Sequence, residues 1–133
     1  MTEDVTVLEE TATVGEALRL LSDLEIRHLP VVRGREVVGM LSDRDLRSLG
    51  LSLVTDMERL DRVSALLSAP VSGLMTADVI RVHAETDLRE VAELMIDEKI
   101  GAVPVVDPET GELSGIVSYV DAMRGMLRVL EPD

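Results

Sequence analysis

The alternation of apolar and polar residues predicts the same short unit twice, in the order strand, helix, strand, strand, helix. The predicted strands are residues 5–8, 29–32 and 37–41 in the first copy, and 79–82, 103–106 and 113–117 in the second. They are rich in β-branched residues and are separated by turns that contain glycine or proline. The last strand of each copy is largely apolar along its length, which predicts burial on both faces.

A helix is predicted between the first and second strands of each copy. Thr13 and Asp87 can cap these helices, and apolar residues then recur at spacings of three and four. Glu16 and Glu90, three positions after the caps, predict a capping box at both helix starts. A further amphipathic pattern in residues 51–69 predicts a helical connector between the copies.

The two copies are an internal repeat. Residues 1–32 align with residues 75–106 at a constant offset of 74, with eleven identical positions. Each copy of such a repeat usually needs its partner to bury its apolar face, so we expect the copies to pack together and to form clefts between them. The expected organisation is a first repeat in 1–50, a connector in 51–74 and a second repeat in 75–133.

Composition narrows the function classes. The chain of 133 residues is 46% hydrophobic but has no Phe, no Trp and one Tyr, so its core must be aliphatic. It has no cysteine, which excludes disulfides, a thiolate nucleophile and cysteine-bound metals. A net charge of −13 argues against nucleic acid and anionic membranes as partners. The acidic start and the lack of a long apolar run predict a cytoplasmic protein.

One motif recurs where the last strand of each copy meets the closing helix: Ser42-x-x-Asp45 and Ser118-x-x-Asp121. A serine followed three residues later by an acid is a helix-capping arrangement, which is a purely structural explanation. The same groups also suit a ribonucleotide, because a hydroxyl can donate to a phosphate oxygen and a carboxylate can accept from two ribose hydroxyls. A glycine three residues before each serine would let a ligand approach the backbone closely.

The ordered set of motifs resembles a known family. Met-Thr-x-Asp-Val, an amphipathic helix, an apolar-Pro-Val-Val strand and Gly-apolar-apolar-Ser-x-x-Asp occur in this order twice. This pattern is similar to that of a tandem pair of CBS domains, also called a Bateman module. The resemblance implies an α/β (α+β) fold of two pseudo-symmetric β-α-β-β-α repeats packed through their sheets, with adenosine-containing ligands bound in clefts between the repeats.

The resemblance also implies roles for individual residues. Ser42 and Ser118 would face phosphate, and Asp45 and Asp121 would hold ribose. The base would be bracketed by the main chain and apolar groups of Val5, Thr6, Leu29, Pro30, Val79, Ile80, Val103 and Pro104.

The two copies are not equivalent in charge. Basic groups of the first copy are Arg27, His28 and Arg44, where the second copy has Gly101, Ala102 and Val120. Guanidinium groups recognise phosphate well, so we expect unequal affinities, with one site better suited to phosphate. The sequence alone leaves open which cleft each side chain serves.

An enzyme is not expected. The chain has no Gly-rich phosphate loop and no G-x-S-x-G motif, and its two histidines are far apart in the sequence. The expected function is a regulatory ligand sensor, and the alternative is a dimerisation scaffold with vestigial clefts. The acidity of the chain favours AMP or S-adenosylmethionine over ATP, unless Mg²⁺ bridges phosphate to carboxylates.

The signal would pass through an unidentified protein partner or a change in oligomeric state. The resemblance favours a homodimer formed through exposed apolar faces of the closing helices. The residues expected on these faces are Leu46, Leu49, Ala122, Met123, Met126, Leu127 and Leu130.

Overall fold

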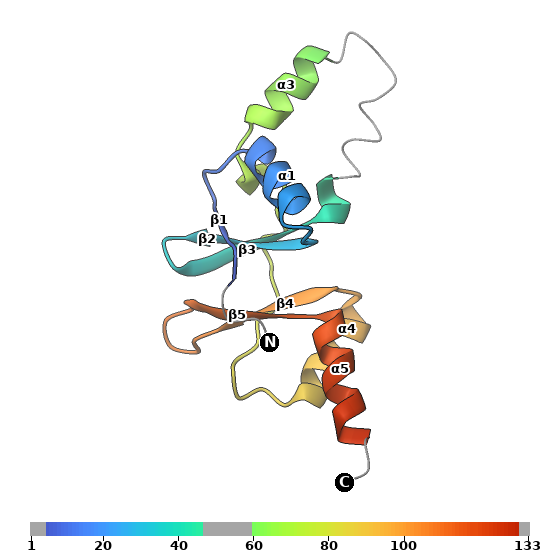
Figure 1. The fold of residues 1–133 in the computed structure, drawn as a ribbon. Helices are drawn as coiled ribbons and strands as arrows, with labels where there is room; N and C mark the ends of the chain where they lie inside the picture. The colour runs from blue at the N-terminus through green and yellow to red at the C-terminus, as the bar shows by residue number, and fades with distance from the viewer. Residues whose placement is uncertain (1–4, 47–59, 131–133) are drawn as a thin grey trace. The chain divides into compact units, whose positions relative to one another are not determined.

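A computed structural model describes residues 5–46 and 60–130 (Figure 1). The chain divides into two compact units. The first-copy unit comprises residues 6–34 and 38–79, and the second-copy unit comprises residues 80–133 with residues 1–5 and 35–37. Each unit is described separately below.

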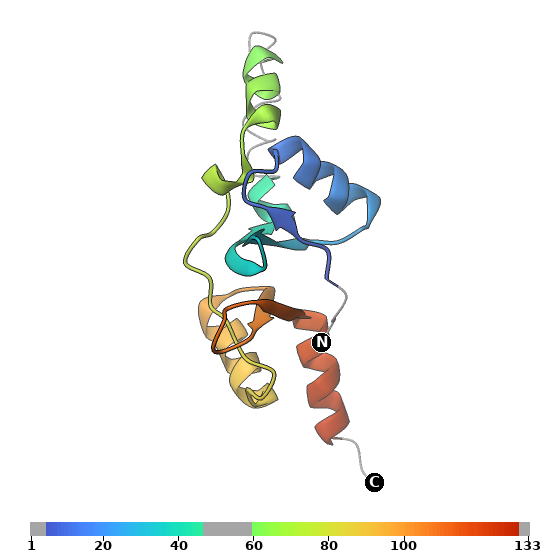
Figure 2. The ribbon, with the colours of Figure 1, turned by 90° about the vertical axis from the view of Figure 1, so that its left-hand side faces the viewer.

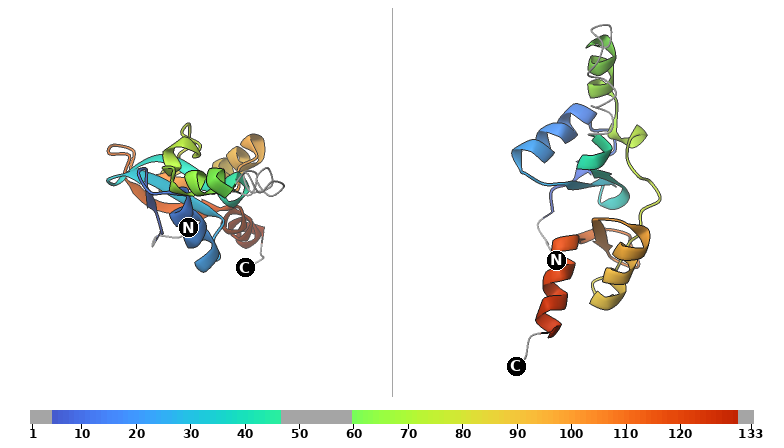
Figure 3. Two further views of the ribbon diagram at one scale, coloured as in Figure 1. Left: turned by 90° about the horizontal axis from the view of Figure 1, so that it is seen from above. Right: turned by 90° about the vertical axis from the view of Figure 1, so that its right-hand side faces the viewer.

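The first-copy unit contains a small sheet with α1 on one face (Figure 3). Its elements are β1 (Leu8–Glu9), α1 (Val14–Asp23), β2 (His28–Arg33), β3 (Glu36–Ser42) from residue 38 onward, α3 (Leu60–Ser68) and the 3₁₀ helix η2 (Val71–Gly73). The strand order is β1-β2-β3, and Leu8 in β1 pairs in parallel with Val31 in β2. The Thr13 side chain caps α1, and Glu16 completes the predicted capping box.

The second-copy unit repeats this plan. Its elements are α4 (Leu88–Glu98), β4 (Ala102–Val106), β5 (Leu113–Ser118) and α5 (Tyr119–Leu130). Strands β4 and β5 pair antiparallel, and Val82 makes a parallel bridge to Val105, at the positions equivalent to Leu8 and Val31. Helices α4 and α5 lie side by side on the strand pair (Figure 2).

The two units use the same sequence positions for their cores, and both cores are aliphatic. Buried residues of the first unit and their equivalents in the second are Leu8 and Val82, Ala17 and Val91, Leu21 and Met95, Leu29 and Val103, Val31 and Val105, and Leu46 and Ala122. The internal repeat is therefore also a repeat of packing.

Several details differ from the sequence prediction. Strand β1 begins at Leu8 rather than at residue 5, and of residues 79–82 Val82 alone forms a described bridge. The second capping box is wrong, because Asp87 accepts from the N–H of Arg89 at 3.3 Å without a described return bond from Glu90. The connector is confirmed as helical over α3, and residues 51–59 lie outside the described residues.

The prediction that the last strand of each copy is buried on both faces is also wrong. Buried and half-exposed residues alternate along β3, and Gly115 is the one buried residue of β5. Each of these strands follows a hairpin partner and covers the core with one face, so the apolar residues on its other face are only half-buried.

The expected apolar faces of the closing helices need a partial correction. Leu46 and Ala122 are buried within their own units, at 5% and 4% exposure. Met126 is half-buried, and Leu49 lies outside the described residues. Met123, Leu127 and Leu130 are exposed, as predicted. None of the described helices combines the length and apolar character that a membrane crossing requires.

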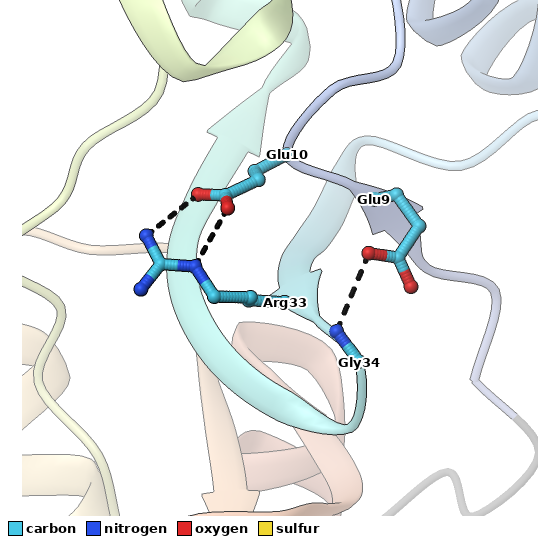
Figure 4. Close-up of polar contacts among 4 residues, drawn as sticks. All are labelled: Glu9, Glu10, Arg33 and Gly34. Carbon is cyan, nitrogen blue, oxygen red and sulfur yellow. Dashed lines mark hydrogen bonds and ion pairs between the residues drawn. The ribbon is translucent and has the colours of Figure 1, made fainter.

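Hydrogen bonds tie the end of β2 and the turn that follows it to the end of β1 and the next residue (Figure 4). Arg33 donates to both carboxylate oxygens of Glu10, at 2.6 and 3.1 Å, and the N–H of Gly34 donates to Glu9 at 3.3 Å. The hydrogen bonds from Arg33 lower the pKa of Glu10. The second copy has Asp107 in place of Arg33, and its carboxylate instead accepts from the N–H of Glu109 at 2.8 Å within its own turn. This turn is therefore a point of divergence between the copies.

Two residues that end equivalent helices have a left-handed backbone. Glu25 after α1 and Lys99 after α4 have φ values of 53° and 56°. The backbone of a residue with a side chain is strained in this conformation, whereas the backbone of glycine is not. We expect Lys99→Gly and Glu25→Gly each to raise the free energy of unfolding by about 1 kcal/mol, measured by urea denaturation. Lys99→Ala serves as the control and should give no such gain.

Candidate functional site

The serine and aspartate of the first motif bond to each other. Ser42 is the last residue of β3, and residues 43–46 are helical. The N–H of Ser42 donates to Asp45 Oδ2 at 2.9 Å, and the N–H of Asp45 donates to Ser42 Oγ at 3.1 Å. Both residues are half-buried. The motif is thus a reciprocal cap at the start of a helix, as the structural explanation predicts.

The second motif has the same geometry. The N–H of Ser118 donates to Asp121 Oδ2 at 3.1 Å, and the N–H of Asp121 donates to Ser118 Oγ at 3.2 Å. We call these two arrangements the first junction, around residues 42–45, and the second junction, around residues 118–121. Capping uses only one oxygen of each aspartate and one lone pair of each serine. Within the described ranges, Oδ1 of both aspartates and both hydroxyl protons have no other protein partner.

A backbone hydrogen bond brings the start of the second strand of each copy to its junction. The N–H of Asp43 donates to the carbonyl of Arg27 at 2.8 Å, and the N–H of Tyr119 donates to the carbonyl of Gly101 at 2.8 Å. The first junction therefore gathers Arg27, His28 and Arg44 within one unit. Asp43 and Tyr119 were not identified as site residues from the sequence, although each directly follows the serine of its motif.

His28 lies close enough to the carboxylate of Asp45 for the two to interact. The imidazole is half-buried, and this burial lowers the pKa of His28. The carboxylate of Asp45 opposes the shift, whereas the guanidinium of Arg27 adds to it. The neutral imidazole is therefore favoured in the folded protein.

The lowered pKa of His28 predicts a pH dependence of stability. The unfolded chain binds a proton at His28 more readily than the folded chain does, so stability rises with pH through this range. We expect the contribution of His28 to be complete above pH ~6.5 and to be lost as the pH falls below that value. Urea denaturation between pH 8 and pH 5.5 measures it. His28→Gln should flatten the dependence and His83→Gln should retain it; equal profiles for both variants would contradict the assignment.

The residues expected to bracket a base occupy two environments. Leu29 and Val103 are fully buried in the cores of their units, and Pro30 and Pro104 are fully buried as well. Val5, Thr6, Val79 and Ile80 are half-buried. The assembly of these residues with the two junctions into shared clefts stays a prediction.

The glycine before the first motif does not leave open backbone. A Cβ at Gly39 would lie 2.8 Å from Cγ of Met75 and 3.1 Å from the carbonyl oxygen of Thr76, with the sulfur of Met75 closer still. The close approach that requires glycine is thus made by the chain itself. The expectation that Gly39 admits a ligand is not supported by these contacts.

No metal centre is formed by the part of the chain that the structure describes: its His, Asp and Glu side chains do not gather in groups of three or more that could hold an ion. The possible role of Mg²⁺ beside a bound phosphate stays a prediction.

Comparison with known proteins decides the family. The CBS domain family matches residues 1–52 and 71–128, which together make up most of the chain. The chain belongs to the CBS domain family. The predicted mixed α/β fold with two CBS repeats is confirmed by this match and by the structural neighbours below.

Relatives of this CBS pair are found in Arabidopsis thaliana and in Vibrio cholerae. CBSX1, a chloroplastic CBS domain-containing protein of Arabidopsis thaliana, is 31% identical, over 96% of this chain and 61% of its own length. CBSX2 of the same plant, solved in complex with AMP, is 29% identical with a TM-score of 0.79 over 96% of this chain and 91% of that chain. A putative acetoin utilization protein from Vibrio cholerae is 30% identical with a TM-score of 0.78, over 99% of this chain and 94% of that chain. The chain spans less than two thirds of the length of the curated relatives it matches, 61% of CBSX1 for example.

Proposed function

We propose that this CBS pair is a regulatory, non-catalytic module that binds an adenosine-containing ligand of the AMP or S-adenosylmethionine class. The observation that carries the proposal is the pair of Ser/Asp junctions, which keep a hydroxyl proton and a carboxylate oxygen uncommitted in both copies. The AMP complex of CBSX2, a relative that matches nearly all of this chain, supports the same ligand class.

Each junction offers the groups that a ribonucleotide needs. Ser42 and Ser118 donate their hydroxyl protons to a phosphate or another acceptor, and the free oxygens of Asp45 and Asp121 accept from the ribose hydroxyls. Carboxylate–hydroxyl bonds are charge-assisted and therefore stronger than neutral ones. AMP is favoured over ATP because the net charge of −13 repels added phosphates.

The module acts on a protein partner or through its own association. A cytoplasmic location and a homodimer through α5 belong to this proposal. One observation favours a second candidate, a dimerisation scaffold: Met123, Leu127 and Leu130 expose 49%, 60% and 75% of their surface along α5. Such an apolar stripe is typical of an interaction surface.

Ligand binding to alanine variants of the aspartates tests the proposal. We expect isothermal titration calorimetry to detect binding of AMP or S-adenosylmethionine to the wild-type protein, and Asp45→Ala with Asp121→Ala to weaken it at least about tenfold, because charge-assisted hydrogen bonds are lost. Both substitutions also remove a helix cap, at a cost of about 1 kcal/mol in stability.

Thr13→Ala is the matched control, since it removes the cap of α1 and leaves both junctions intact. It should lower stability by a similar amount and bind the ligand as the wild type does. Absence of binding to the wild-type protein, or equal binding by the aspartate variants, would overturn the sensor and leave the scaffold.

A further inference from the structure

The two junctions are built alike but differ in charge. At the first junction, the charges of Arg27 and Arg44 balance those of Asp43 and Asp45. At the second junction, glycine, alanine, tyrosine and valine occupy the positions equivalent to Arg27, His28, Asp43 and Arg44. The charge of Asp121 is not balanced there by a basic residue of the motif or of its neighbouring strand start. At these positions the second junction therefore lacks the guanidinium groups that would favour a phosphate, whereas an uncharged nucleoside does not need them.

The second junction also contains the single tyrosine of the chain, which has no Phe and no Trp. Tyr119 follows Ser118 directly, and its N–H is held by the carbonyl of Gly101 at 2.8 Å. Tyr119 and Val120 expose 52% and 53% of their surface on the first turn of α5, although apolar and aromatic side chains gain by burial. Stacking of a nucleobase on an aromatic ring contributes about 1–3 kcal/mol, a factor of about 5 to 150 in affinity.

We infer that the two junctions have diverged in ligand class: the second recognises an uncharged nucleoside through Tyr119, and the first recognises a phosphate-bearing ligand through Arg27 and Arg44. This inference rests on the proposed function and names the ligand part that each junction selects. His28 lies at the first junction and Tyr119 at the second. Each junction therefore contains one aromatic side chain whose NMR signals can report ligand binding there.

The composition of the chain permits a direct test by proton NMR. With no Phe or Trp, the aromatic side-chain signals come from Tyr119, His28 and His83 alone, and His28→Gln and His83→Gln assign the two histidines. We expect adenosine to shift the Tyr119 signals, inorganic phosphate to shift those of His28 without moving Tyr119, and AMP to shift both. His83 should stay unchanged with all three compounds.

Three substitutions separate the junctions. Tyr119→Ala should weaken adenosine binding about tenfold, by loss of stacking, and leave the response of His28 to phosphate intact. Arg44→Val should weaken AMP binding about tenfold at the first junction, since a charge-assisted contact is lost. The reverse exchange, Val120→Arg, should allow inorganic phosphate to shift Tyr119.

The outcomes distinguish this inference from the function on which it rests. If the wild-type protein binds AMP while Tyr119→Ala binds adenosine unchanged, or while phosphate shifts Tyr119 as strongly as it shifts His28, the division of ligand classes is wrong and the sensor remains. If neither adenosine nor AMP binds to the wild-type protein, the proposed function itself fails.

Discussion

Replacing Leu29 with alanine is expected to lower the free energy of unfolding by about 2–5 kcal/mol. Leu29 is fully buried and packs in the first-copy core with Val31 and Leu41, which are also at 0% exposure. The loss combines the transfer free energy of the removed methyl groups with the cavity that remains. The described residues of this core include no aromatic side chain that could shift to fill that space. Urea denaturation followed by circular dichroism measures the change.

Two matched variants make the test specific. Val103 occupies the equivalent position in the second-copy core and is also at 0% exposure, so Val103→Ala should cost about 1–3 kcal/mol for its smaller side chain. Leu24 is 48% exposed, and Leu24→Ala should cost less than about 1 kcal/mol. If Leu29→Ala costs no more than Leu24→Ala, the assignment of Leu29 to the core is wrong.

The features predicted best from sequence are those with a local cause. The helices after Thr13 and Asp87 follow from spacings of three and four, which the repeat shows twice. The pairing of Ser42 with Asp45 follows from their separation by one helical turn, and so does that of Ser118 with Asp121. These interactions need only a few consecutive residues, so the sequence contains all the information that they require.

The features predicted poorly depend on residues far apart in the sequence. Strand β1 is short because it pairs with β2 only at Leu8 and Glu9, and its propensity for strand does not reveal where a partner ends. The bond from the N–H of Asp43 to the carbonyl of Arg27 joins the residue after β3 to the residue before β2, across a whole hairpin. Sequence patterns show that these elements exist but not which backbone groups meet.

Gly39 is the clearest example of such a distant constraint, and it gives the second large effect. We expect Gly39→Val to lower the free energy of unfolding by about 2–3 kcal/mol. Its Cβ would lie 3.1 Å from the carbonyl oxygen of Thr76 and 2.8 Å from Cγ of Met75. The backbone cannot withdraw, because Met40 and Thr76 exchange two hydrogen bonds, at 3.0 and 2.9 Å. Urea denaturation again measures the change.

A double-mutant cycle identifies the cause of this loss. Met75→Ala removes the flexible part of the obstruction but leaves the carbonyl of Thr76, so the double variant Gly39→Val, Met75→Ala should be more stable than the sum of the single effects predicts, by about 1 kcal/mol. Gly73→Val is the control, since a Cβ at Gly73 meets no atom within 4 Å. Additive effects in the cycle would mean that Met75 is not what excludes a side chain at position 39. β3 ends at Ser42, in the first junction. Non-additive effects of Gly39→Val and Met75→Ala would therefore show that Met75, near the start of the second repeat, helps to hold in place the strand that leads into this junction.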